Sequence, residues 1–246
     1  MSRFFQSSIP HPTSNLFQYF IRQYQTMSEQ SQYLQSPTID QAKLVQVNKP
    51  VFLQRKVTTS QKVLQIAKDL QLLGHQEGGF FKETDRSPLY MENPYSEKNT
   101  NSYRQATTTS KDKTISRNYS TLIYYLITSE SAIGRLHRNH SRIIHILQKG
   151  RGQYVLVYPD GTIKSFIVGF DFANGEVAQW VVPGGVYKAS FLLPLEEEPS
   201  GDDCLLISEV VVPGFEWDDH RFMESKDELS ELVGEEKAEE LGWLLG

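Results

Sequence analysis

Short apolar runs separated by turn residues cover the middle of the chain, from about residue 75 to residue 215. The runs are GFFKET, STLIYYLIT, IIHILQKG, GQYVLVYP, TIKSFIVG, AQWVVPG, YKASFLL and CLLISEVVVP. PDG at 159–161 predicts a hairpin turn between two of these runs, and PGG at 183–185 and PGF at 213–215 end others. So many short strands at near-regular spacing predict an antiparallel sandwich or barrel, and not a sheet in which strands alternate with helices.

Apolar residues at helical spacing occur on either side of this region. In SQKVLQIAKDLQLLG at 60–74, apolar residues recur at intervals of three and four, Ser60 is a candidate N-cap, and Gly74 stands where a helix C-terminal glycine belongs. In DELSELVGEEKAEELGWLL at 227–245, two amphipathic stretches flank Gly234. We therefore predict an all-β fold with one preceding helix and C-terminal helices.

Two polar segments without periodicity divide the chain further. Residues 29–60 are typical of a linker, and residues 91–117 are too long and too polar for an ordinary hairpin loop. The first 28 residues contain Arg3 and Arg22 but no acid, which suits a mitochondrial targeting peptide, a disordered extension, or a true start at Met27. We predict an extension and linker at 1–60 and one domain at 61–246, with a polar loop insertion at 91–117.

Charge is distributed unevenly along the 246 residues. The net charge is −5, and residues 224–240 alone carry −6, from eight acids and two lysines, which leaves about +1 for the remainder. A nucleic-acid surface would need clustered basic residues, so we expect no nucleic acid as a partner. The acidic segment is typical of a solvated helix face.

The single cysteine, Cys204, lies in the apolar run CLLISEVVV. No intramolecular disulfide can form, which favours a reducing compartment. No apolar run reaches transmembrane length, so we expect no membrane partner and a cytoplasmic location, with nuclear access or mitochondrial targeting as alternatives. The chain also lacks a GxGxxG or phosphate-loop motif, which argues against a nucleotide-fold enzyme.

Four sequence blocks occur in an order that carries a family resemblance: HQEGGFFKETDRS at 75–87, LHR…H…G at 136–150, QWVVPGGVYKAS at 179–190 and EVVVPGFEWDDH at 209–220. Together they resemble the cupin superfamily, and more narrowly the uncharacterised branch of RmlC-like cupins with an EGG[FY]xxET opening. The resemblance covers about residues 62–245. It implies a double-stranded β-helix (jelly roll), usually a homodimer, with a pocket for a small-molecule ligand inside the barrel.

Many cupins bind a transition metal through His-x-His, a following glutamate and a later histidine. The corresponding positions here hold, in order, His137, Asn139, Ile143 or Ile144, and Lys188. One of four ligands remains, so the resemblance implies no ordinary cupin metal site, and we expect no cofactor. His140 and His145 could form a different site with His137, although no acid accompanies them.

The remaining pattern is similar to that of the metal-free dTDP-sugar epimerases, in which a histidine of an LH[RY] block removes a proton next to a sugar carbonyl and a tyrosine returns one. The resemblance implies that His137 is the base, and Tyr125 is the candidate acid. Because Tyr124 and Tyr125 are adjacent on one strand, one of them points inward whatever the register. We find no counterpart of the epimerases' catalytic tyrosine segment or of a carboxylate that orients the histidine.

Further polar residues are candidates for binding a ligand in the barrel: Tyr124, Arg138, His145, Gln153, Gln179, Lys188, Glu209 and Glu77. Glu209 is the most informative, because it interrupts the apolar run LLISEVVV and a carboxylate there needs a partner or water. It is either paired with Lys188 or an arginine, or lines a pocket. His145, in IIHIL, is either a pocket residue or a hydrogen-bonded core histidine.

Three functions fit these residues. The first is a metal-independent epimerase or isomerase that acts on a carbohydrate-like or nucleotide-linked ligand, with His137 as base. The second is a cupin that binds a small molecule without chemistry. The third is a metal-dependent cupin with an atypical histidine site, which the lost ligands favour least.

Overall fold

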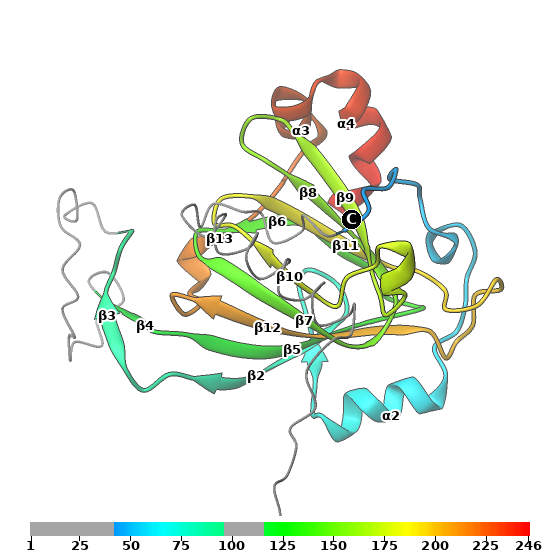
Figure 1. Cartoon of the computed structure of the whole chain (residues 1–246), viewed down its shortest axis with the longest axis horizontal. Helices are drawn as coiled ribbons and strands as arrows, with labels where there is room; N and C mark the ends of the chain where they lie inside the picture. The colour runs from blue at the N-terminus through cyan, green and yellow to red at the C-terminus, as the bar shows by residue number, and fades with distance from the viewer. Residues whose placement is uncertain (1–41, 96–115) are drawn as a thin grey trace, which may run out of the picture. The chain divides into compact units, whose positions relative to one another are not determined.

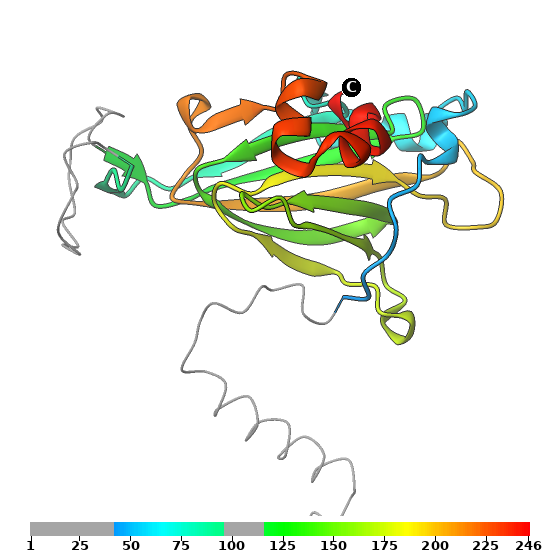
Figure 2. The same cartoon turned by 90° about the horizontal axis from the view of Figure 1, so that it is seen from above.

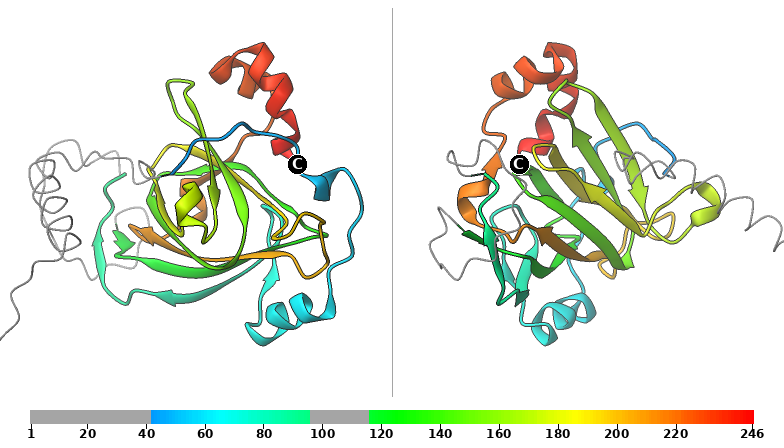
Figure 3. Two further views of the ribbon diagram at one scale, coloured as in Figure 1. Left: turned by 45° about the vertical axis from the view of Figure 1, so that its right-hand side comes forward. Right: turned by 60° about the vertical axis from the view of Figure 1, so that its left-hand side comes forward.

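The computed structural model describes residues 42–95 and 116–246, and in these residues two antiparallel sheets enclose the interior of a barrel. The first sheet has six strands, in the order β1 (Leu73–Gly74), β2 (Phe80–Arg86), β5 (Thr121–Thr128), β12 (Cys204–Val212), β7 (Arg142–Gly150) and β10 (Gln179–Val182). The second has five, in the order β13 (His220–Phe222), β6 (Ile133–Asn139), β11 (Tyr187–Leu192), β8 (Gly152–Val157) and β9 (Ile163–Val168). Figure 3 (left) shows the strands curving around this interior. The predicted all-β jelly roll is confirmed.

Turns predicted from the sequence join these strands. PDG at 159–161 forms the β8–β9 hairpin, in which Tyr158 N donates to Thr162 O over 2.9 Å and Gly161 has a φ of 82°. A third, two-stranded ladder pairs β3 (Tyr90–Glu92) with β4 (Ser116–Asn118). The predicted polar insertion at 91–117 begins and ends in this ladder, and its centre, 96–115, lies outside the described residues.

Helix α2 (Gln61–Asp69) precedes the barrel as predicted, and Ser60 is its N-cap, since its side chain accepts a hydrogen bond from Val63 N. The prediction that Gly74 ends this helix is wrong. The helix stops at Asp69, the chain turns through Gln71 with a φ of 56°, and Gly74 belongs to strand β1. Leu73, the last apolar residue at helical spacing, lies exposed in β1, whereas Leu72 is the residue that packs under α2.

Two short helices close the chain, as predicted. They are α3 (Lys226–Val233) and α4 (Glu235–Leu241), joined at Gly234, which has a φ of 86°, and followed by the 3-10 turn η4 (Gly242–Leu245). Figures 1 and 2 show α3 and α4 beside the five-stranded sheet, whereas α2 lies on the far side of the barrel, against the six-stranded sheet. Two further 3-10 turns are η2 (Phe172–Asn174) and η3 (Trp217–Asp219).

Residues 42–60, placed in the linker by the sequence analysis, pack on the barrel. Val45 N donates to Ser165 O of β9 over 2.9 Å, and Phe52, in the 3-10 turn η1 (Val51–Leu53), is buried in the core between the sheets. The structured domain therefore begins before residue 61. The predicted targeting or disordered segment at 1–28 lies outside the described residues. Among those that are described, no helix has the length and apolar character needed to cross a membrane.

Strand alternation sorts the side chains into an inner core and two outer ones. The inner core includes Trp180, Phe166 and Ile207. One outer core packs α3 and α4 against the five-stranded sheet, and the other packs α2 against the six-stranded sheet. The apolar outer faces of the sheets pack against the helices. The buried polar side chains described next lie on the inner faces.

Candidate functional site

Cross-strand pairing brings four candidate residues to the inside of the barrel. His137 on β6 pairs with Lys188 on β11, and His145 on β7 pairs with Glu209 on β12. Directly paired residues point to the same face of a sheet, with Cβ atoms about 5 Å apart. All four side chains are buried. The sequence analysis named each of them, and the strand register places them on facing sheets.

Three of these residues form one hydrogen-bonded group. Lys188 Nζ donates to Glu209 Oε2 over 2.8 Å and to His145 Nε2 over 3.0 Å. Because an ammonium can only donate, His145 accepts at Nε2 and is a neutral ring in this arrangement. Of the alternatives left open for Glu209, the pair with Lys188 is present, and the carboxylate faces the barrel interior. We call this set the Lys188 group.

Burial sets the protonation behaviour of the Lys188 group. Burial raises the pKa of the Glu209 carboxyl, and although Lys188 partly offsets this, the pKa remains above its ordinary value. Burial and the positive charge of Lys188 hold the pKa of His145 well below its usual range. A carboxyl with a raised pKa beside a fixed cation is an arrangement often found at acid–base sites.

An aromatic wall lies against the Lys188 group. The His145 ring stacks on Trp180, with centroids 5.0 Å apart and an interplanar angle of 10°, and meets the edge of Tyr154 at 5.4 Å. The Trp180 indole Nε1 is buried and donates no hydrogen bond within the described part of the chain. Buried donors are normally satisfied, so this N–H is available to an oxygen atom of a ligand.

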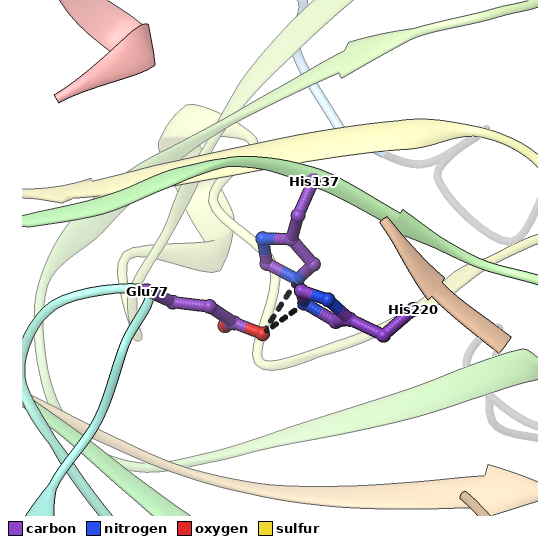
Figure 4. A group of neighbouring side chains, drawn as sticks. All are labelled: Glu77, His137 and His220. Carbon is purple, nitrogen blue, oxygen red and sulfur yellow. Dashed lines mark hydrogen bonds and ion pairs between the residues drawn. The ribbon is translucent and has the colours of Figure 1, made fainter. Parts of the chain in front are cut away.

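A second polar group gathers around Glu77, in the turn between β1 and β2. Figure 4 shows one carboxylate oxygen facing two neighbouring imidazoles, and this oxygen, Oε1, is 3.2 Å from His137 Nε2 and 3.0 Å from His220 Nε2. The turn is held close to β6, because Arg135 N donates to Glu77 O over 2.8 Å. A side chain at Gly78 would place Cβ 2.2 Å from Ile133 O, so the EGG block needs glycine there.

Backbone contacts fix the orientation of the His137 ring. Its Nδ1 lies 2.7 Å from Arg135 O, and since a carbonyl only accepts, Nδ1 carries the proton. Burial lowers the pKa of His137 to about 3, despite the opposing charge of Glu77, so the neutral ring directs the Nε2 lone pair toward Glu77. Burial acts to raise the pKa of Glu77, but the hydrogen bond from His220 and the positive charge of Lys188 act to lower it.

This geometry bears on the predicted roles of His137 and Tyr125. Both His137 nitrogens face protein atoms, Arg135 O and Glu77 Oε1, so neither is directed at a position that a ligand could take. Tyr125 points inward, as expected for one of the two adjacent tyrosines, and its hydroxyl donates to Gly78 O over 2.9 Å. Burial raises the pKa of Tyr125 well above its ordinary value, an effect that Glu77 and Glu209 strengthen.

Comparison with known proteins agrees with this architecture. The family model described as "Cupin superfamily (DUF985)" matches residues 64–223. The chain belongs to this cupin family. It is 61% identical over 180 residues to the uncharacterised protein YML079W of Saccharomyces cerevisiae, an alignment that covers 73% of this chain and 84% of that protein.

Two solved structures extend the comparison. A hypothetical protein from Leishmania major is 26% identical, with a TM-score of 0.58 over 73% of this chain and 96% of the other. Protein SO0799 from Shewanella oneidensis is 22% identical, with a TM-score of 0.53 over 72% and 94% of the two chains. The second likeness shows the cupin fold alone.

The remaining ligand candidates of this cupin lie away from both polar groups. Tyr124 packs on the outer face under α2, and Arg138 lies on the outer face with its guanidinium 5.2 Å from the Tyr187 ring. Gln153 donates to Gln46 O over 2.9 Å, and Gln179 is exposed on β10. Each follows from strand alternation, because an immediate neighbour on the same strand faces inward.

Sequence reasoning missed two kinds of residue. The first kind is the pair of histidines beside Glu77, namely His220 and His75, whose Nδ1 accepts from Glu77 N over 3.2 Å. Both lie in blocks that carried the family resemblance, which was the available signal. The second kind is the inner aromatic wall of Trp180 and Tyr154. The alternative set of His137, His140 and His145 does not converge among the described residues, since His140 is half-exposed.

One surface groove has no connection with these groups. It has a volume of about 290 Å³ and lies on the outer side of the barrel, between residues 45–47 and α4. Its lining includes Ile163, Lys237 and Leu241, and none of the predicted site residues. The buried polar residues described above therefore lie inside the barrel, in the Lys188 group and around Glu77, and not at this groove.

Proposed function

We propose that this cupin binds a small, carbohydrate-like carbonyl compound inside the barrel and isomerises it by proton transfer. The observation that carries the proposal is the Lys188 group, in which Lys188 Nζ lies 2.8 Å from Glu209 Oε2 on the inner face of the barrel. A buried carboxylate and a buried cation in contact supply a base and an electrophile at one place.

The proposed chemistry assigns one role to each member. Lys188 donates a hydrogen bond to the carbonyl oxygen, where negative charge develops as the neighbouring carbon loses its proton. Glu209, as carboxylate, takes that proton and leaves an enediolate whose negative oxygen Lys188 stabilises. The proton of the neighbouring hydroxyl passes to this oxygen, and the Glu209 carboxyl, after exchange with solvent, gives a proton to the former carbonyl carbon, so that the carbonyl group moves to the neighbouring carbon. The N–H of Trp180 binds a further ligand oxygen, and the rings of Trp180 and Tyr154 provide apolar surface for a sugar ring.

Glu209 is a better base than His137 for this reaction. The lone pair of His137 Nε2 faces Glu77, whereas the Glu209 carboxylate accepts its side-chain hydrogen bond from Lys188, the residue proposed to hold the substrate's carbonyl oxygen. Binding without chemistry is the competing function, and solvent deuterium distinguishes the two. An isomerase exchanges the transferred proton with solvent, while a binding protein leaves the ligand unlabelled.

The test begins with the full-length protein purified under native conditions, from which small molecules are released by denaturation and measured by mass spectrometry. We expect the wild type and Tyr124→Phe, which alters only the outer face, to release the same compound. Lys188→Met should release at least about tenfold less, because it loses the charged hydrogen bond. Incubated in D2O with that compound, the wild type should introduce one deuterium, and Glu209→Gln should introduce none.

Two results would count against the proposal. Equal release from the wild type and Lys188→Met would remove Lys188 from the binding site. A compound that binds the wild type but gains no deuterium would establish a binding protein in place of an isomerase.

A further inference from the structure

We propose that Glu77, His137 and His220 form a binding site for a divalent transition-metal ion. Within the described residues, these three form the single group of histidine, cysteine and acidic side chains whose ligand atoms all lie within 4.8 Å of one another. They come from three separate segments, the turn before β2, strand β6 and strand β13, and meet at one point (Figure 4).

Two of the three separations between the ligand atoms suit a common metal centre, and the third, between the two Nε2 atoms, is within 4.8 Å. Ligands about 2.1 Å from a metal, at angles between those of an octahedron and a tetrahedron, lie about 3.0–3.4 Å apart. Glu77 Oε1 is 3.2 Å from His137 Nε2 and 3.0 Å from His220 Nε2. The side chain of Glu77 keeps 11% of its surface exposed, so the group is not sealed from an entering ion.

Surrounding contacts orient the ligands as they do in metal sites. The Arg135 carbonyl holds the Nδ1 proton of His137, which leaves Nε2 as the coordinating nitrogen. His220 follows Asp219, which forms a buried ion pair with Arg117 at 3.0 Å and so anchors the segment. His137 Nε2 makes no hydrogen bond, although it is buried and faces a carboxylate oxygen. A metal ion between these two atoms would accept both lone pairs and remove their repulsion.

The proposed site differs from the metal site of many cupins. It shares only His137 with the His-x-His, glutamate and histidine pattern, and its other ligands come from the EGG and WDDH blocks. His75 is not a ligand, because its Nδ1 accepts from Glu77 N and its ring stacks near Trp217. The inference goes beyond the proposed isomerase and does not depend on proton transfer by Glu209.

The ligand types select the class of metal. Two imidazoles and one carboxylate suit zinc, iron, cobalt or nickel, whereas magnesium and calcium prefer oxygen ligands alone. Three ligands on one side of the ion leave further positions open for water or a substrate, as in catalytic sites. No thiolate takes part, since the single cysteine, Cys204, is buried in the outer core under α2.

The experiment measures metal binding directly in the full-length protein. After treatment with a chelator, the wild type is dialysed against Zn²⁺, and the bound metal is counted by mass spectrometry. We expect one ion per chain, and an affinity at least about 100-fold lower in Glu77→Gln and in His220→Gln. His140→Gln, at a half-exposed histidine, and His145→Gln, at a buried one, are matched controls that should bind as the wild type does.

A wild type that binds no Zn²⁺, or binds it no more tightly than Glu77→Gln, would overturn the inference. Circular dichroism shows whether each variant is folded. Should a ligand variant fail to fold, X-ray absorption at the zinc edge of the wild type decides. A spectrum that shows zinc bound by two imidazoles and by oxygen ligands supports the site, and a spectrum that shows any other set of zinc ligands contradicts it. Failure here leaves the Lys188 group untouched, because neither Zn²⁺ binding nor this spectrum reports on deuterium exchange.

Discussion

His145 is a buried imidazole surrounded by charged and aromatic groups. Lys188 on β11 and Glu209 on β12 face its Nε2, at 3.0 Å and 3.5 Å, while Trp180 on β10 and Tyr154 on β8 pack against its ring. Adding a proton would place a second cation beside the Lys188 ammonium. The folded state therefore holds this ring neutral.

The low pKa of His145 predicts a pH dependence of stability. An unfolded histidine takes up its proton as the pH falls below about 6.5, whereas folded His145 resists protonation. The unfolded state then binds more protons, so stability falls as the pH falls below that value. Urea unfolding at pH 7, 6 and 5 should show the wild type losing up to about 1.4 kcal/mol per pH unit relative to His145→Gln.

The comparison with His145→Gln isolates one group, because Glu209 and the other histidines titrate in both proteins. Parallel stability curves for the two proteins between pH 7 and pH 5 would show that His145 titrates normally in the folded state, contrary to its burial.

For single residues, the alternation of side chains along a strand explains which site residues the sequence could predict, and the pairing of distant strands explains which it could not. Glu209 was a candidate because it interrupts an apolar run, and a Lys188–Glu209 pair was one of the alternatives. The Glu77–His220 contact joins residues 143 positions apart, across strands that are not consecutive. No local sequence pattern predicts which distant segments lie side by side. The contact between Glu77 and its neighbouring imidazoles could therefore be found only in the structure.

Gly150 and Gly185 show two different reasons why a position needs glycine: a left-handed backbone, and lack of space for a Cβ atom. Gly150, at the end of β7, has a φ of 88°, and a Cβ there would lie 1.6 Å from Cys204 O. Gly185, in the PGG turn, has a φ of 81°, but a Cβ there would meet nothing within 4 Å. Both have left-handed backbones, and only Gly150 also lacks space.

We expect Gly185→Ala to lower the free energy of unfolding by about 1 kcal/mol, from backbone strain alone. Gly150→Ala should cost several times more, because the chain at Cys204 must move and the β7–β12 pairing with it. Chemical denaturation of both variants gives the comparison. Equal losses would show that β7 and β12 can separate at this end without cost.

The longer the apolar or alternating pattern of a strand, the more easily the sequence predicted that strand. Long strands such as β5 and β12 alternate or stay apolar over eight or nine residues and were recognisable. The short strands β1, β3 and β13 have two or three residues each, too few for any period to show, and they exist because neighbouring strands offer them backbone partners. β13 carries His220. Because this strand is too short to be recognised from its pattern, the sequence did not indicate His220 as a site residue.

The domain as a whole combines two apolar outer cores with a partly charged interior. Helices α2, α3 and α4 cover the outer faces, where the apolar residues of the long strands lie. The interior holds Lys188, Glu209 and Glu77, which are buried, together with His137 and His145. Burying charges costs free energy that pairing only partly recovers, so a barrel selected for stability alone would have an apolar interior.

Replacing the ion pair by apolar residues tests this argument. Lys188→Met alone leaves Glu209 buried without its cation and should lower the free energy of unfolding by about 3–5 kcal/mol. The double variant Lys188→Met with Glu209→Met removes both charges at similar volume, so it should recover most of that loss or exceed the wild type. Urea denaturation at pH 7 measures all three proteins. A double variant as unstable as the single one would mean that the pair holds the two sheets together. Recovery of stability without ligand release would instead mean that the charges are present for what the barrel binds.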